Sequence, residues 1–135
     1  MKHLTVTAAI LRYRNEILCM QRNQSKFDYI SYKFEFPGGK AEADESFEQC
    51  LSRELLEEME LSIFVVPDQF YMTVEHTYPD FSITMHSYLI DVDTKKFTRK
   101  EHIDHKWLKP EDLRTLDWAP ADQPIVDKLV KDFVV

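Results

Sequence analysis

The chain has 135 residues, which suits one domain with one hydrophobic core, and its 44% apolar content is ordinary for a globular protein. Its formal charge of −7 argues against broad binding to nucleic-acid polymers, which requires a basic surface. No apolar run approaches the roughly 20 residues of a membrane span, and the alternating N-terminus predicts a strand, not a signal peptide. Cys19 and Cys50 are too few for a disulfide framework, so we expect a reducing compartment, the cytoplasm.

Strands make up most of the predicted secondary structure, because apolar and polar residues alternate over short stretches bounded by turn residues. The predicted strands are residues 4–12, 16–21, 34–36, 69–75, 81–91 and 105–108. Between the second and third strands, residues 23–33 are polar and aromatic and predict a loop. Pro37 ends the third strand, and we expect the neighbouring Gly38 and Gly39 to turn the chain.

Two helices are predicted. The first begins at Ser46, which forms a capping-box pattern with Gln49, and apolar residues at helical spacing continue it to about residue 58. The second lies at the C-terminus and begins at Asp122 or two residues later, after a helical turn at residues 110–113. Strands on both sides of one strong helix, followed by another helix, predict a layered α/β or α+β domain.

The first predicted helix carries three carboxylates, Glu54, Glu57 and Glu58, which share one side because they stand three and four positions apart. Like charges in this arrangement repel each other, and helix formation does not reward it. A solvated acidic face is the ordinary explanation, but these carboxylates border the apolar stripe instead of lying opposite it. Three hard oxygen ligands suit Mg²⁺ or Mn²⁺, whose charge would relieve the repulsion.

The spacing of the residues around this helix resembles the Nudix box of the Nudix hydrolases. The matching positions are Gly39-x5-Glu45-x7-Arg53-Glu54-Leu55-x-Glu57-Glu58-x-x-Leu61. One position departs from the family pattern, because Glu60 stands where the family usually has a glycine that ends the helix in a left-handed conformation. Keeping that conformation with glutamate would cost roughly 1 kcal/mol. Further segments resemble the MutT branch, namely residues 35–40, 78–80, 107 and 119–124.

This resemblance implies a single Nudix domain over residues 1–135, an α/β/α sandwich around a mixed sheet. It also implies a Mg²⁺-dependent hydrolase, with Mn²⁺ as the other candidate, acting on a small nucleotide. The MutT branch includes 8-oxo-dGTP diphosphatases and CTP pyrophosphohydrolases, which release a nucleoside monophosphate and pyrophosphate and so cleanse the nucleotide pool. Expected substrates are therefore 8-oxo-dGTP, (d)CTP or a 5-substituted dCTP.

Two alternatives to this function stay open. One is hydrolysis of other nucleoside diphosphate derivatives, such as ADP-ribose or dinucleoside polyphosphates. The other is a non-catalytic module that binds a nucleotide or a protein partner. Neither the residues nor the resemblance distinguishes a monomer from a homodimer.

The resemblance also implies roles for individual residues in catalysis. The metal ions would be held by Gly39, Glu54, Glu57, Glu58 and Glu101. Glu101 is included because it lies six residues before Trp107, although a surface charge on a loop explains it equally well. One of these carboxylates would take the proton from the attacking water. Arg53 would fix a box glutamate by an ion pair, and Glu45 would have a structural role.

Substrate contacts are implied for residues on both sides of the glycine pair. They are Arg22, Phe36, Gly38, Gly39, Lys40, Tyr78 and Asp122. Lys40 would contact a phosphate oxygen, or else be a solvated lysine. Asp122 matches a base-reading position and, when ionised, only accepts hydrogen bonds, which suits the N–H groups of cytosine or guanine. Its alternative role is to cap the last helix.

Two histidines near Glu101, His102 and His105, stand three positions apart as a zinc pair can. The sequence nearby offers no cysteine and no third histidine, so we do not predict zinc.

Overall fold

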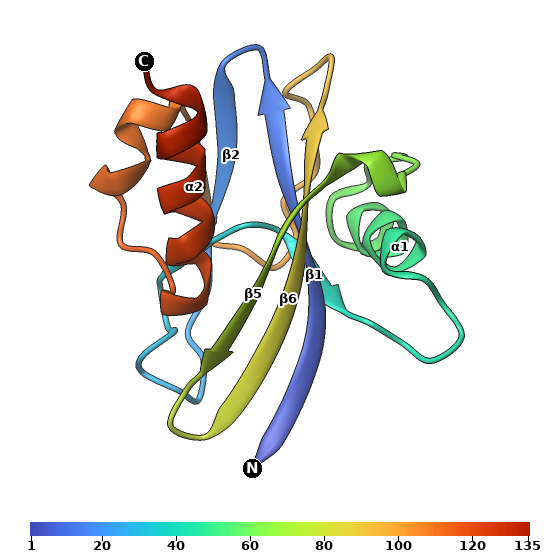
Figure 1. The fold of residues 1–135 in the computed structure, drawn as a ribbon, viewed down its shortest axis with the longest axis vertical. Coiled ribbons are helices and arrows are strands. Elements are labelled where there is room, and N and C mark those ends of the chain that lie inside the picture. Colours follow the sequence, from blue (N-terminus) through green and yellow to red (C-terminus); the bar gives the residue numbers. More distant parts are fainter.

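A seven-stranded mixed sheet forms the centre of this computed structural model of residues 1–135, with helices α1 and α2 on opposite sides of it (Figure 1). The main path of strands runs β3-β2-β1-β6-β5, while β4 pairs with β1 and β7 pairs with β2. The β1–β6 pair is parallel and all other pairs are antiparallel. The strands are β1 Lys2–Tyr13, β2 Glu16–Gln21, β3 Phe34–Glu35, β4 Gly38–Lys40, β5 Phe70–Thr77, β6 Phe81–Asp91 and β7 Asp104–Leu108.

Strand β4 corrects the expectation that the two glycines turn the chain. Neither glycine has a positive φ, and both pair in antiparallel register with β1, Gly38 with Ala8 and Gly39 with Thr7. A Cβ atom on Gly38 would lie 1.9 Å from the carbonyl oxygen of Thr7. Glycine is therefore required here for the close approach of two strands and not for backbone freedom.

Helix α1 spans Phe47–Met59 and begins with the predicted capping box. The Ser46 hydroxyl accepts from the Gln49 amide at 3.0 Å, and the Gln49 side chain accepts from the Ser46 amide at 2.8 Å. The helix ends at Glu60, which has φ 55° and ψ 35°. The left-handed ending is thus kept although the residue is not glycine.

Helix α2 spans Gln123–Phe133 and follows two short 3₁₀ helices, Pro110–Thr115 and Pro120–Asp122; a third lies at Pro67–Gln69. Asp122 precedes α2, but its side chain makes no capping hydrogen bond. The capping alternative for Asp122 is therefore wrong, and the carboxyl group has another partner. Neither α1 nor α2 has the length and apolar character needed to cross a bilayer.

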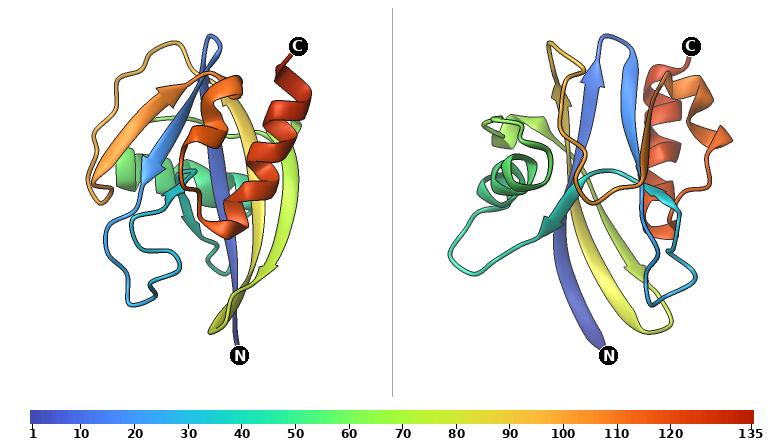
Figure 2. Two further views of the ribbon diagram at one scale, coloured as in Figure 1. Left: turned by 90° about the vertical axis from the view of Figure 1, so that its left-hand side faces the viewer. Right: turned by 180° about the vertical axis from the view of Figure 1, so that it is seen from behind.

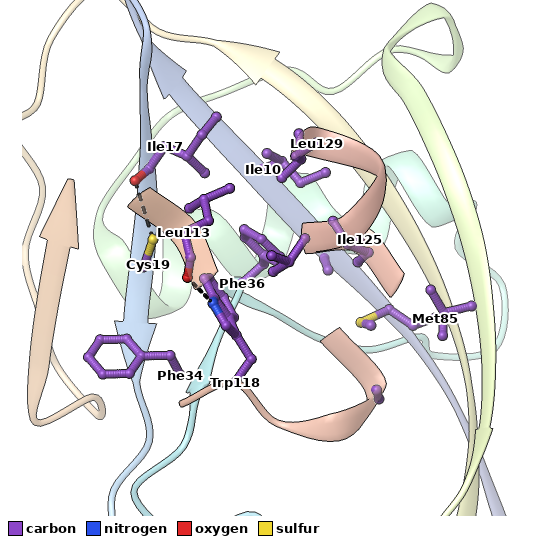
Figure 3. Close-up of a cluster of buried hydrophobic side chains, with 14 of the residues drawn as sticks. Ile10, Ile17, Cys19, Phe34, Phe36, Met85, Leu113, Trp118, Ile125 and Leu129 are labelled. Atoms are coloured by element: carbon purple, nitrogen blue, oxygen red, sulfur yellow. Dashed lines mark hydrogen bonds between the residues drawn. The ribbon is translucent and has the colours of Figure 1, made fainter. Parts of the chain in front are cut away.

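The sheet separates two apolar cores, because successive side chains of a strand point to opposite faces. On β1, Ala8 and Ile10 belong to the core beneath α2, whereas Ala9 and Leu11 belong to the core beneath α1. Figure 3 shows the α2 side, where the Trp118 ring stacks on Phe36 at 4.7 Å and its indole N–H donates to the Leu113 carbonyl at 2.7 Å. Seen from behind, the helices flank the sheet and the chain termini lie at opposite ends (Figure 2).

Candidate functional site

Two adjoining pockets meet at strand β4. One, of about 490 Å³, is lined by side chains that pack on the α2-side core and by Ser25, Lys26, Phe27 and Ile30. The other, of about 720 Å³, is polar and borders α1. Five residues line both pockets: Arg22, Glu35, Gly38, Gly39 and Lys40. A further pocket of about 510 Å³ beside Trp107 contains none of the predicted site residues.

The polar pocket is lined by all four carboxylates predicted to hold metal ions. Glu54, Glu57 and Glu58 come from α1, and Glu101 comes from the segment between β6 and β7. Burial raises the pKa of Glu54, and repulsion from Glu57 and Glu101 adds to the effect against the opposing charge of Arg53. Burial likewise raises the pKa of Glu58, and the negative charge of the nearby Glu101 carboxylate adds to the effect. The pocket therefore holds more negative charge than its surroundings neutralise.

Arg53 organises the box glutamates, as predicted. Its guanidinium group donates to Glu45 at 2.7 Å, Glu54 at 2.9 Å and Glu57 at 3.2 Å, and to the carbonyl oxygen of Lys40 at 3.2 Å. The hydrogen bond from Arg53 lowers the pKa of Glu45 to about 2. Arg53 thus joins α1 to the end of β4 and fixes the direction of the carboxylates. Glu45 points to this arginine and does not line the pocket, which agrees with a structural role.

Gly39 lies against the carboxyl group of Glu54. A Cβ atom at position 39 would stand 2.2 to 2.5 Å from the three atoms of that carboxyl group. Any larger residue would therefore push Glu54 out of place. Glycine at position 39 therefore leaves the space that the Glu54 carboxyl group occupies.

The donor set of the polar pocket fits a divalent metal ion. Carboxylate oxygens are the hard ligands that Mg²⁺ and Mn²⁺ prefer, and a cation would relieve the repulsion that raises the pKa values of Glu54 and Glu58. No three acidic, histidine or cysteine side chains are drawn together as a closed ligand set. Instead, Glu54 and Glu57 both bind Arg53.

Asp122 lies at the inner end of the other pocket and is only 5% exposed. Its carboxyl group accepts a hydrogen bond from the backbone amide of Phe36 at 3.1 Å. Burial, together with the negative charge of Glu35, raises the pKa of Asp122 well above its usual range. This shift favours the neutral carboxyl group, which both donates and accepts hydrogen bonds, over the ionised form, which only accepts them.

The aromatic wall of this pocket consists of Phe27, Tyr78 and Phe81, and Tyr29 packs against these rings without lining the pocket. Tyr29 stacks on Tyr78 with ring centroids 5.2 Å apart, and Phe27 packs on both Tyr29 and Phe81 at 5.4 Å. The hydroxyl of Tyr29 also donates to Asp80 at 2.9 Å, which ties residues 23–33 to the β5–β6 turn. Sequence reasoning missed Phe27 because nothing in a polar loop shows which strands it will cover.

Two predicted substrate contacts serve the core as well as the pocket. The Tyr78 ring is 5% exposed, and its hydroxyl accepts from the Ala121 amide at 2.9 Å. Phe36 is 3% exposed, so its backbone amide, and not its ring, is the group held beside Asp122. Both residues line the pocket while supporting its floor.

Arg22, Glu35 and His102 occupy the junction of the two pockets. One Glu35 oxygen accepts from Arg22 at 2.9 Å, and the other pairs with His102 Nε2 at 2.8 Å. The charge of Arg22 and the His102 hydrogen bond outweigh the effect of burial, so the pKa of Glu35 lies below its usual value. Sequence reasoning assigned no role to Glu35 or His102. The nearby Lys40 ammonium makes no ion pair, and His105 bonds to Arg99 and not to the site.

Comparison with known proteins shows which family and which proteins this chain resembles. The family model described as NUDIX domain matches residues 1–129. The chain is 31% identical over 131 residues to an 8-oxo-dGTP diphosphatase of Escherichia coli K12, covering 96% of this chain and 98% of that protein. It is 32% identical over 127 residues to a CTP pyrophosphohydrolase of the same organism, covering 94% and 91% of the two chains.

The fold also matches a solved structure along its whole length. The solution structure of MutT, a Nudix hydrolase from methicillin-resistant Staphylococcus aureus 252, superposes with a TM-score of 0.73 at 35% identity. The match covers 98% of this chain and 99% of that one. The mixed sheet with flanking helices, expected from the sequence, is thus confirmed by both the structure and this neighbour.

Proposed function

Because the chain belongs to the NUDIX family and is a MutT-type hydrolase acting on pyrophosphate bonds, we propose that it hydrolyses a modified or non-canonical nucleoside triphosphate. The products are the nucleoside monophosphate and pyrophosphate, so the reaction cleanses the nucleotide pool. The observation that carries the proposal is the contact of an aromatic pocket, which Asp122 lines, with the polar pocket that holds the four candidate metal-binding carboxylates. A base fits the first pocket and a polyphosphate with its cations fits the second.

In the proposed reaction the acidic pocket would hold the divalent cations that accompany the phosphates. Glu54, Glu57, Glu58, Glu101 and the carbonyl group of Gly39 would hold Mg²⁺ or Mn²⁺. A bound cation would supply charge neutralisation on the phosphate oxygens and lower the pKa of water. One of the carboxylates accepts the proton of the attacking water, which requires a group within hydrogen-bonding reach of it.

Two basic residues assist in this scheme without accepting protons. Arg53 holds Glu54 and Glu57 in fixed directions through the contacts described above. The unpaired ammonium group of Lys40, which lines both pockets, donates to a phosphate oxygen at the junction. Arginine stays protonated at neutral pH, so Arg53 takes no part in proton transfer.

The aromatic pocket selects the base. Tyr78 and Phe27 provide apolar surface for the ring, Arg22 borders the ring edge, and Asp122 reads that edge by hydrogen bonds. A protonated Asp122 pairs with an edge that carries both a donor and an acceptor, as cytosine and 8-oxoguanine both do. The two similar proteins from E. coli support 8-oxo-dGTP and (d)CTP as the first substrates to test.

A hydrolysis panel tests this function. Purified protein would be incubated with 8-oxo-dGTP, dGTP, CTP, dCTP, 5-methyl-dCTP and ADP-ribose, each with Mg²⁺ and with excess chelator, and the products identified by mass spectrometry. We expect a monophosphate and pyrophosphate from 8-oxo-dGTP or a cytidine nucleotide, and only with Mg²⁺. Turnover of ADP-ribose alone, or hydrolysis that resists the chelator, would contradict the proposal.

The same proposal places the enzyme in a reducing compartment, the cytoplasm, acting as a monomer or homodimer on small nucleotides. Both cysteines, Cys19 and Cys50, are buried as free thiols, which is compatible with that setting.

A further inference from the structure

Of the four candidate metal-binding carboxylates in the acidic pocket, Glu101 is the one that does not lie on α1. It belongs to residues 92–103, a segment without regular structure that joins β6 to β7. Lys100 donates from its ammonium group to the carbonyl oxygen of Glu57 at 3.1 Å, which ties the segment to the end of α1. On the other side, the amide of Ile103 donates to the carbonyl oxygen of Gln21 at 3.0 Å. Glu101 lies between these two attachments, so its position depends on how the segment is held here.

His102 provides the most buried of these attachments. Its side chain is 14% exposed and pairs through Nε2 with Glu35 at 2.8 Å, whereas the ammonium-bearing side chain of Lys100 is 43% exposed. Glu35 is itself held from the opposite side by Arg22 at 2.9 Å. A hydrogen bond to a partly buried, charged carboxylate is stronger than an ion pair in solvent. Backbone hydrogen bonds join the segment to Met59 of α1 and Gln21 of β2, and the His102 side chain adds the attachment to strand β3 that lies next to Glu101.

We propose that His102 is a positioning residue, which holds Glu101 in the acidic pocket by binding Glu35. The inference rests on the proposed function, because it assumes that Glu101 acts in catalysis. His102 touches neither the metal ions nor the reacting phosphate in this scheme. Its effect passes through the backbone to the adjacent residue, and Arg22 extends the same contact to the pocket that receives the base.

The structure assigns the role to this histidine and not to the other polar neighbours of Glu101. Lys100 also contacts Glu60 at 3.8 Å, but both side chains are substantially exposed, so that attachment is weak. His105 bonds to Arg99 and packs on Phe97, away from the acidic pocket. Only the His102 contact joins the segment to a residue that lines both pockets.

The test compares three single variants with the unmodified enzyme. His102→Ala removes the contact, and His102→Gln restores a donor near the position of Nε2. His3→Ala is the control, because His3 bonds to Ser82 and Thr84 at the exposed end of the sheet and lies outside both pockets. Steady-state kcat and KM would be measured on the best nucleotide, and amide hydrogen exchange would be followed over residues 98–103 without metal.

We expect His102→Ala to lower kcat by about 10- to 100-fold with a smaller change in KM, the size of effect that a displaced catalytic group produces. Exchange over residues 98–103 should become faster in this variant, while His102→Gln recovers much of both properties. In a Glu101→Gln background, His102→Ala should cause little additional loss, because the two residues act through one path.

Three results would overturn the positioning role: wild-type kcat in His102→Ala, unchanged exchange over residues 98–103, or an equal loss with and without Glu101. Failure of the proposed function looks different, because the unmodified enzyme would then hydrolyse none of the nucleotides. The exchange measurement still decides whether His102 anchors the segment in that case.

Discussion

At the scale of single residues, Asp122 shows how surroundings determine chemistry. The carboxyl group is buried beside Glu35, and its one protein hydrogen bond comes from the Phe36 amide. Its pKa in the folded protein therefore lies above the value of about 3.9 in an unfolded chain. Such a group binds its proton more tightly when folded. Its stabilising contribution is complete at low pH and is lost as the pH rises through the folded pKa.

Replacing Asp122 with Asn should accordingly stabilise the protein at neutral pH. The amide keeps the acceptor for Phe36 and is neutral without a bound proton, whereas the folded wild-type protein binds a proton at Asp122 more tightly than the unfolded chain does. We therefore expect the free energy of unfolding at pH 7.5 to rise by about 1 kcal/mol or more. The advantage should shrink toward pH 4, where the unfolded chain also binds that proton. Urea unfolding at both pH values measures it. Asp127→Asn, at a solvent-exposed ion pair with Arg114, is the control and should change little.

Glu57 offers a second test at this scale. Its side chain is 53% exposed and shares Arg53 with Glu54, so Glu57→Gln should hardly affect unfolding. If Glu57 binds a metal ion that the reaction needs, kcat should fall by about 100-fold or more. The control is Glu48→Gln on the same helix, which keeps an acceptor for Tyr88 and should retain activity. Wild-type turnover in Glu57→Gln would remove this residue from the metal site.

At the scale of elements, strand β4 contains two neighbouring glycines, and a side chain would meet different atoms at each. A methyl group at Gly38 would collide with the backbone of β1, which cannot move without breaking the pair, whereas at Gly39 it would meet only the end of the Glu54 side chain. The two alanine variants should therefore separate stability from catalysis. Gly38→Ala strains the pairing of β4 with β1, and Gly39→Ala displaces the Glu54 carboxylate.

We expect Gly38→Ala to lower the free energy of unfolding by more than about 2 kcal/mol. Gly39→Ala should fold nearly normally but lose about 100-fold in kcat, because Glu54 is moved from its place. Urea unfolding and steady-state kinetics on the same two preparations compare the effects. Equal losses of stability in both variants would show that the side chain of Glu54 cannot yield.

The end of α1 provides another test of an element. Glu60 adopts a left-handed conformation that glycine reaches more easily, and its pair with Lys100 at 3.8 Å is exposed and weak. Glu60→Gly should therefore raise the free energy of unfolding by about 0.5 to 1 kcal/mol. Glu60→Ala, which loses the pair but keeps a Cβ atom, should not gain. Thermal unfolding would contradict this if the glycine variant were the less stable.

The elements that the sequence predicted well are those set by local rules. The capping box of Ser46 and Gln49, the apolar spacing of α1 and the alternation of β1 and β6 all depend on nearby residues, and the structure confirms them. The fixed spacing of the box likewise indicated which glutamates share a pocket. Their roles in catalysis stay predictions.

The features that the sequence did not predict depend on contacts between distant residues. Strand β4 needs Thr7 beside Gly39, and the group of Arg22, Glu35 and His102 is assembled from three separate elements. The raised pKa of Asp122 follows from burial, which no short motif records. Such contacts are set by the path of the whole chain.

At the scale of the whole molecule, the two pockets couple ligand binding to global stability. A nucleotide with Mg²⁺ bound across β4 would contact α1 on one side and the α2-side core on the other. Binding to the folded state alone should raise its stability by about 2.7 kcal/mol at 100 times the dissociation constant. Thermal unfolding with a non-hydrolysable substrate analogue measures this, and chelator should abolish the gain. No shift in Tm at saturating ligand would contradict the proposed site.

The position of β4 between the pockets has a consequence for the order in which products depart. In the proposed reaction, the bond that breaks lies near the strand that separates the two compartments, so the nucleoside monophosphate and the pyrophosphate finish in different chambers. Each pocket is open to solvent. The nucleoside monophosphate and the pyrophosphate can therefore dissociate independently, and each product can inhibit the enzyme while the other pocket is empty.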